Sequence, residues 1–271
     1  MVASLMSALP GSVAQGLIWG ILAIGVYITY KVLDFADLTV DGSLATGGAV
    51  AVMCMLNGAN TYVALILAFL AGMLAGLVTG LFHTALGIPP ILAGILTQLG
   101  LYSINMRIMG KANQAISVMQ YDVLVSLRYI PHACLLTTGF CIVIIALLYW
   151  IFGTEIGASV RATGCNPNMA RAQGINTNAT KVLGLVISNG LVGLAGALYA
   201  QYQGSADINM GRGAIVIGLA AVIIGEVVFG KIFHNFALHM VAVVIGAIIY
   251  YLVIAIVMKL GLEPTDLKLV S

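Results

Sequence analysis

The longest polar interval of this sequence, residues 153–181, reads GTEIGASVRATGCNPNMARAQGINTNATK. It interrupts a chain that is otherwise almost entirely apolar. We predict two short helices within it, over residues 155–162 and 167–173. Helices of this length are unstable alone in water, so they must pack against other parts of the protein. The interval is therefore predicted to form a rigid surface element that passes force to a partner. Ordinary loop caps between two membrane spans are the alternative.

Capping chemistry sets the predicted bounds of these two helices. Glu155 places an acid in the first turn of the first helix, and Gly164 follows its end as a left-handed stop. Asn166 fits as the N-cap of the second helix, with Pro167 as its first residue and Gly174 as its stop. Each helix thus has both a start and an end signal in the sequence.

Composition determines the class of protein. The chain has 271 residues, of which 61% are hydrophobic and 7% charged, and its mean hydropathy is +1.10. A soluble globular domain carries about 25% charged residues, so this chain is a multi-pass membrane protein that contacts the lipid bilayer. A net charge of +2 without a basic run gives no support for nucleic-acid binding.

Apolar segments predict an all-α, polytopic membrane protein with about eight transmembrane helices, because a span needs about 20 apolar residues. Two of the segments are short and rich in glycine, and we expect them to be broken or re-entrant helices. Six predicted spans are full length, at residues 9–30, 62–86, 91–109, 131–152, 182–200 and 236–258, and the short ones are residues 43–56 and 213–229. Gly72, Gly76 and Gly80 give the third segment a face for close helix contacts.

An internal echo precedes both short segments. The run ADLTV at residues 36–40 resembles ADINM at residues 206–210, and each run lies between a full span and a short apolar segment. We interpret the echo as an inverted repeat in a single permease domain, residues 1–271, with chance similarity as the alternative. The predicted parts are a first half at 9–109, a linking helix at 131–152, a loop at 153–178, a second half at 179–258 and a polar tail at 259–271.

Polar residues in or beside the spans are candidates for lining a weakly binding path, with helix–helix hydrogen bonding as the alternative. A path with few fixed charges suits a neutral or zwitterionic solute. The candidates are Asp37, Thr39, Thr97, Gln98, Asn105, Ser188, Asn189, Asp207 and Asn209, together with Tyr27, Tyr30, Tyr199 and Tyr202.

Catalytic and metal-binding motifs are absent from the sequence. There is no zinc-protease motif, nucleophile elbow or phosphate loop, and the four cysteines are expected to be reduced thiols without a metal. We therefore predict that the chain is not an enzyme and has no catalytic residues. Glu226 lies in an apolar run, and we interpret it as an interfacial carboxylate satisfied beside Lys231 rather than as a coupling-ion site.

The runs GASVRATG at 157–164 and MARAQGIN at 169–176 resemble the cytoplasmic coupling loop of ABC-importer permeases of the branched-chain amino acid type. That group includes ribose-type sugar permeases and aromatic amino acid permeases, and the resemblance extends loosely over most of the chain. It implies that Arg161 and Arg171 contact an ATPase and that the glycines shape the loop. The loop residues it implies are Glu155, Gly157, Arg161, Ala162, Gly164, Asn166, Pro167, Arg171 and Gly174.

The resemblance also implies the partners and the location. It implies two cytoplasmic ABC ATPase subunits, which hold the ATP and Mg, an extracytoplasmic solute-binding protein, and a second permease copy in a homodimer. This chain would then have no cofactor of its own and would lie in the bacterial inner membrane. The implied solute is a branched-chain or aromatic amino acid. The alternatives are a sugar or nucleoside, an ATP-independent carrier or channel, and a membrane scaffold.

A cytoplasmic position of the loop implies that both termini lie outside the cell. The distribution of lysine and arginine does not decide this orientation. Relatives that the chain resembles carry one more helix beyond the segment DLKLVS at 266–271, so the polar tail is expected to be a trimmed end.

Overall fold

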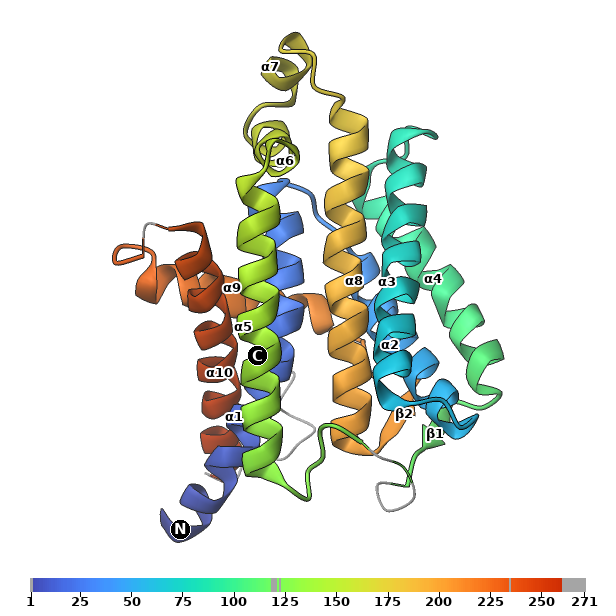
Figure 1. The fold of residues 1–271 in the computed structure, drawn as a ribbon, viewed down its shortest axis with the longest axis vertical. Helices are drawn as coiled ribbons and strands as arrows, with labels where there is room; N and C mark the ends of the chain where they lie inside the picture. Colours follow the sequence, from blue (N-terminus) through green and yellow to red (C-terminus); the bar gives the residue numbers. More distant parts are fainter. Residues whose placement is uncertain (1, 118–120, 122, 234, 260–271) are drawn as a thin grey trace.

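The computed structural model describes residues 2–117, 121, 123–233 and 235–259, which form an elongated helical bundle (Figure 1). In this part of the chain, 7 helices are long and apolar enough to cross a membrane. They are α1 (Val2–Tyr27), α2 (Thr39–Leu56), α3 (Thr61–Thr84), α4 (Pro90–Met109), α5 (Ile130–Gly153), α8 (Thr177–Gln203) and α10 (Phe236–Lys259). The shorter apolar helix α9 (Ala214–Phe229) brings the total to the predicted eight.

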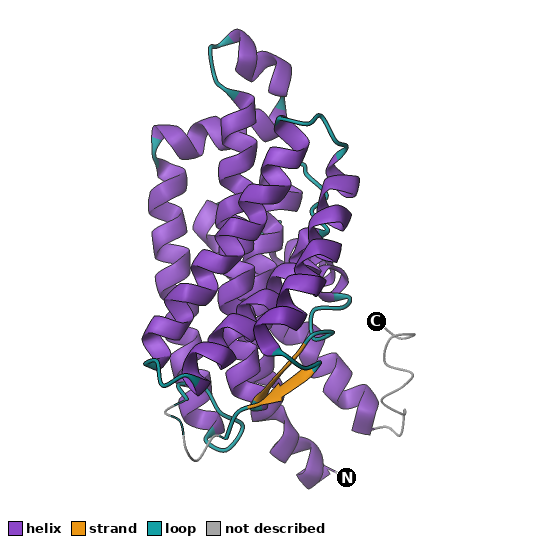
Figure 2. Cartoon of the chain, turned by 90° about the vertical axis from the view of Figure 1, so that its right-hand side faces the viewer, coloured by secondary structure: helices purple, strands orange, loops and turns teal. Residues whose placement is uncertain are grey.

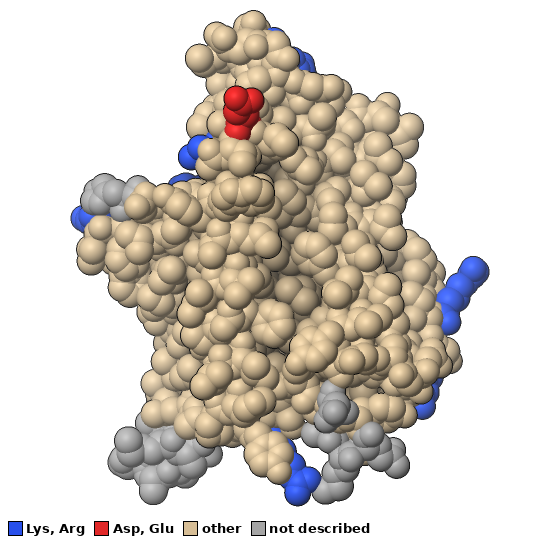
Figure 3. All heavy atoms as spheres, viewed as in Figure 1, with Lys and Arg blue, Asp and Glu red and all other residues tan. Residues whose placement is uncertain are grey.

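Two short helices project from one end of the bundle, at the top of Figure 1. They are α6 (Glu155–Cys165) and α7 (Pro167–Ala172). On the face shown in Figure 3, charged side chains lie around this end, at the left and right margins and at the lower edge, and the broad central surface shows none. This distribution is that of a protein whose middle lies in hydrocarbon.

A small β-pair lies at the opposite end of the bundle (Figure 2). β1 (Asn113–Ala115) and β2 (Ser205–Asp207) are antiparallel, with Gln114 opposite Ala206. Neither segment has a strand signal in the sequence, so the all-α prediction missed this pairing. The pair ties the connection between α4 and α5 to the end of α8.

The first interruption of helical structure lies between α1 and α2, and we call residues 33–38 the first break. α1 continues as a π-helix (Ile28–Val32), and the chain then turns at Asp34, whose φ of 52° is left-handed. α2 begins at Thr39, four residues before the predicted start at residue 43. The reason is that the Asp37 carboxylate accepts a hydrogen bond from the backbone N–H of Thr39 at 2.9 Å and fixes the turn there.

The second interruption lies between α8 and α9, and we call residues 204–213 the second break. α8 ends at Gly204, with φ 74°, and α9 starts after Gly213, with φ 84°. Asp207 accepts from the backbone N–H of Asn209 at 2.7 Å, the same local hydrogen bond that Asp37 makes with Thr39. The two echo segments therefore share a turn as well as a sequence pattern.

Helix packing relates the two ends of the chain. α3 and α2 both pack on α8, and α10 and α9 both pack on α1. The predicted close contacts of α3 are confirmed, because a Cβ at Gly72 or Gly76 would overlap the carbonyl oxygen of Asn189 or Leu185 on α8. This arrangement is compatible with an inverted repeat, but the proposed bounds of the halves stay a prediction. Of the predicted polar tail, only Lys259 lies within the described residues.

Candidate functional site

The α6–α7 segment, residues 154–176, largely follows its predicted capping. The side chain of Asn166 accepts from the backbone N–H groups of Asn168 and Met169 at 3.1 and 3.0 Å, and Pro167 is the first residue of α7. Gly174 has φ 82° and directly follows the last turn of the helix. The N-cap, the first residue and the stop of the second short helix are therefore as expected.

Gly164 does not stop α6, which corrects the prediction. The helix continues to Cys165, and Gly164 has no left-handed φ. A Cβ at this position would overlap the carbonyl oxygen of Val32, at the end of the π-helix. The glycine is required by the close approach of α6 to the start of the first break, which a local capping argument does not consider.

Further contacts fix α6 and α7 to the bundle. Thr163 on α6 and Thr180 on α8 share a hydrogen bond of 2.9 Å, and Val160 is buried. The guanidinium of Arg171 donates to the Thr177 hydroxyl at 2.7 Å. Gly157 is packed against the backbone of Phe152. The segment is thus a braced projection.

The outer surface of this projection is mixed in chemistry. Ile156 and Met169 are 59% and 62% exposed, so large apolar side chains face outward. The other exposed residues include Glu155, Arg161, Ala162 and Arg171. Exposed apolar and cationic groups on a rigid support are suited to protein contact.

Glu226 forms an ion pair with Lys31 at 3.0 Å, whereas the sequence argument chose Lys231. Glu226 lies in the last turn of α9, and Lys31 in the π-helix that precedes the first break. The predicted satisfied carboxylate is therefore confirmed, and its assigned neighbour is wrong. Tertiary packing brings these residues together although 195 positions separate them.

A buried polar network surrounds the first break. The Asn189 side chain on α8 donates to the Asp37 carboxylate at 2.7 Å and accepts from the Ser43 hydroxyl at 2.6 Å. Asp37 is 2% exposed, and Ser43 and Asn189 are fully buried. The network joins the break, α2 and α8 near the middle of the bundle.

Other predicted path residues also make hydrogen bonds between helices. The hydroxyl of Thr79 on α3 lies 2.7 Å from that of Thr39 and donates to Thr97 on α4 at 2.9 Å. Ser188 donates to the carbonyl of Gly25 at 2.7 Å. For these residues, the alternative of helix–helix hydrogen bonding is what the geometry shows.

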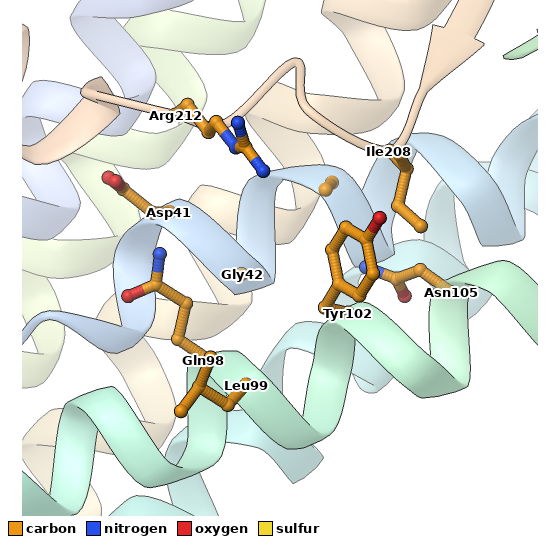
Figure 4. A pocket seen from close by; sticks show the side chains of 9 residues that line it. Asp41, Gly42, Gln98, Leu99, Tyr102, Asn105, Ile208 and Arg212 are labelled. Atoms are coloured by element: carbon orange, nitrogen blue, oxygen red, sulfur yellow. The ribbon is translucent and has the colours of Figure 1, made fainter. Parts of the chain in front are cut away.

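A cavity of about 250 Å³ lies between α2, α4 and the second break (Figure 4). Gln98 and Asn105 were predicted path residues, and the structure places both in its wall. Asp41, Tyr102 and Arg212 were missed. The residues that line it are Asp41, Gly42, Ala45, Gln98, Leu99, Tyr102, Asn105, Ile208 and Arg212.

Two sequence signals could have found this cavity. Gln98, Tyr102 and Asn105 have the spacing i, i+4, i+7, which places three polar groups on one face of a span. Arg212 is a charged residue immediately before the apolar segment 213–229, two residues after the second copy of the echo. Both signals can be recognised only after the ends of the helices are known.

Asp41, in the first turn of α2, joins this helix to the start of α9. Its two carboxylate oxygens accept from the backbone N–H groups of Gly213 and Ile215, each at 2.9 Å. These donors belong to the start of α9, where N–H groups lack partners within the helix. Asp207 and Asn209 lie in the second break, half-buried and exposed respectively, and they do not line the cavity.

Comparison with known proteins identifies the class. The family described as "Branched-chain amino acid transport system / permease component" matches residues 9–270. The chain belongs to this permease family. The permease is 41% identical over 266 residues to a tyrosine transport system permease protein of Clostridioides difficile (strain R20291), covering 98% of this chain and 88% of that relative.

Other relatives extend the comparison. The permease is 36% identical to an uncharacterized protein of Rickettsia prowazekii (strain Madrid E), covering 98% of this chain and 94% of the relative. It is 29% identical to an autoinducer 2 import system permease protein of Yersinia pseudotuberculosis (serotype O:1b, strain IP 31758), covering 76% of this chain and 58% of that relative. The permease is thus an ABC-importer permease of the branched-chain amino acid and ribose type, a multi-pass protein of the bacterial inner membrane.

Proposed function

We propose that this permease passes an amino acid of the aromatic type from an extracytoplasmic binding protein to the cytoplasm in an ATP-driven importer. The observation that carries the solute assignment is the 41% identity to a tyrosine transport system permease over 98% of the chain. The small cavity also favours an amino acid, since its volume of about 250 Å³ lies just below the usual range for ligand pockets of about 300–1,000 Å³. A nucleoside is the second candidate, because a nucleoside permease of Lactococcus lactis is 37% identical over 91 residues.

The proposed ATPase contact is the α6–α7 segment. It projects from one end of the bundle (Figure 1), is braced by Thr163 and Thr180, and exposes Ile156, Arg161 and Met169. In this proposal ATP and Mg are bound by the ATPase chains and not by the permease. Glu155, Ala162 and Arg171 belong to the same contact surface.

Contacts of α6 give a route for motion into the bundle. α6 packs through Gly164 against Val32, directly before the first break, and Lys31 is paired with Glu226 at the end of α9. A rigid-body displacement of α6 would therefore act on both interrupted regions, and the helices beyond them would change access to the path. The inverted-repeat division into residues 9–109 and 179–258 belongs to this proposal.

A second permease copy is proposed to cover the open side of the cavity. Arg212, Leu99 and Tyr102 are exposed in the single chain, and Gln98 lies near the middle of α4. An arginine facing lipid at that depth is costly, so this side is better explained by a water-filled path between two copies.

The function is tested by replacing Gly164 with valine in the full-length protein. Co-purification of an ATPase from native membranes and ATP-dependent uptake of labelled tyrosine are measured together. Gly164→Val should lose most of the uptake, because the side chain would overlap the Val32 carbonyl and displace α6. The control is Gly139→Val in α5, where a Cβ meets nothing within 4 Å.

Two outcomes would contradict the proposal. Wild-type protein that recovers no ATPase would favour an ATP-independent carrier, with Glu226 as the next residue to replace. Equal uptake by Gly164→Val and Gly139→Val would show that α6 does not transmit the driving motion.

A further inference from the structure

Two opposite charges, Asp41 and Arg212, line the cavity between α2, α4 and the second break, yet they are not paired with each other. Across the described residues, the single ion pair is that of Lys31 with Glu226. The Asp41 carboxylate is held by two backbone N–H groups, and the guanidinium of Arg212 makes no hydrogen bond or ion pair with the described residues. An arginine that lines a cavity without a counter-charge among the described residues points to a charged ligand.

A second, independent observation comes from Asn105. Its side chain is 1% exposed, and its Oδ1 has no hydrogen-bond partner among the described residues. A buried acceptor left unpaired is costly, so most such groups in proteins have a partner. Asn105 lines the same cavity as Asp41 and Arg212, which makes a bound donor a natural partner.

We propose that this cavity binds the zwitterionic backbone of an α-amino acid, with Arg212 holding the carboxylate and Asp41 the ammonium group. The inference rests on the proposed function and assigns it a recognition site. Guanidinium and carboxylate groups match in geometry and charge, and Asp41 keeps free acceptor capacity beside its two backbone bonds. A neutral sugar needs neither charge.

The arrangement of the wall also places the solute's side chain. In Figure 4, Asp41 and Gln98 lie at one end, Tyr102, Asn105 and Ile208 at the other, and Arg212 between them. An amino acid held by its two charged groups would direct its side chain toward Tyr102 and Ile208. An aromatic ring would pack there, and a hydroxyl on it could donate toward Asn105.

The experiment measures binding without transport. Full-length permease in lipid nanodiscs is equilibrated with ³H-labelled tyrosine, and two analogues compete: tyramine, which lacks the carboxylate, and 3-(4-hydroxyphenyl)propionate, which lacks the ammonium group. We expect tyrosine to displace the label at least about tenfold better than either analogue, since each has lost one charge-assisted interaction.

Arg212→Gln is the principal variant, because Arg212 is exposed and its side chain has no hydrogen bond or ion pair with the described residues whose loss would unfold the protein. It should weaken tyrosine binding about ten- to a hundredfold and leave tyramine binding unchanged. The matched control is Arg107→Gln, an exposed arginine on α4 that does not line the cavity. Asp41→Asn should weaken the binding of tyrosine and leave the binding of 3-(4-hydroxyphenyl)propionate unchanged.

Three results would overturn the site: no tyrosine binding to the wild-type protein, equal binding by Arg212→Gln and Arg107→Gln, or tyramine competing as well as tyrosine. Uptake driven by ATP separates this proposal from the proposed function. Tyrosine uptake by the wild-type protein with no effect of Arg212→Gln on binding overturns the cavity alone. Tyrosine binding that depends on Arg212, without ATP-dependent uptake, overturns the importer function and supports the cavity.

Discussion

The two breaks share a local turn and differ in what surrounds it. In the first, Asp37 and Thr39 are buried, and the Asp37 carboxylate is also bonded to Asn189 on α8. In the second, Asp207 is half-buried, Asn209 is exposed, and residues 208 and 212 line the cavity. The same sequence pattern therefore anchors one interrupted helix in the bundle and leaves the other beside open space.

This difference separates two roles for interrupted helices. Irregular backbone at membrane depth needs partners for its N–H and C=O groups, and side chains or a water-lined cavity can supply them. The first break uses side chains of α8, and it is the one in contact with α6. The second break borders the cavity, where an exchangeable ligand can bind.

The largest expected effect is the loss of Asn189. Asn189→Leu would leave the Asp37 carboxylate and the Ser43 hydroxyl without their shared partner, so the free energy of unfolding should fall by about 3 kcal/mol. Asn209→Ala, at the position of the second echo that corresponds to Thr39, should change it by less than about 0.5 kcal/mol, because Asn209 is exposed. Thermal unfolding in detergent compares them, and similar losses would show that the breaks are equally anchored.

The second-largest effect is expected at Asp41, which connects α2 to the start of α9. Asp41→Ala removes the acceptor for the N–H groups of Gly213 and Ile215, and we expect a loss of about 2 kcal/mol in the free energy of unfolding. Asp41→Asn keeps a side-chain acceptor and should lose less. The same unfolding assay measures both variants, and an Asp41→Ala protein as stable as the wild type would mean that the start of α9 is satisfied in another way.

Backbone conformation predicts a smaller effect at Gly213. Its φ of 84° is left-handed, and a Cβ there meets nothing within 4 Å. Gly213→Ala should therefore lower the free energy of unfolding only by the cost of a left-handed conformation for alanine, about 1–2 kcal/mol. In the first break, the left-handed residue is Asp34, and Asp34→Gly should be neutral or slightly stabilising. Chemical unfolding of the two variants tests this contrast, which would fail if both changes were equally harmful.

The smallest loss of stability is expected from removing one hydroxyl at the start of α2. Thr39→Val keeps the volume of the side chain and removes the hydrogen bond to Thr79, so the loss should be about 0.6 kcal/mol. Thr79 retains Thr97 and the carbonyl of Ala75 as partners. A double-mutant cycle of Thr39→Val with Thr79→Val measures the coupling free energy of this pair. A coupling as large as the loss expected for Asn189→Leu would show that the threonine pair stabilises the fold as much as Asn189 does.

Much of this protein was determined by the sequence alone. Apolar run length fixes the number of helices, since a span must bury about 20 residues in hydrocarbon. Asn166, Pro167 and Gly174 fix the second short helix through interactions within a few residues. The echo ADLTV and ADINM marks both breaks, because each aspartate bonds to the backbone two residues later. All of these signals are local.

Only the tertiary structure decided which groups meet across the chain. Glycine is the residue type that commonly ends a helix, but Gly164 lies inside α6. It is needed there because a side chain would overlap the Val32 carbonyl. Glu226 selects Lys31 over its sequence neighbour Lys231, and Asp41 reaches the start of α9, more than 170 residues away. Such partners depend on how helices pack, and helix packing brings together residues whose separation carries no periodic signal. The cavity and its two charged side chains exist only because those contacts place the second break beside α2 and α4.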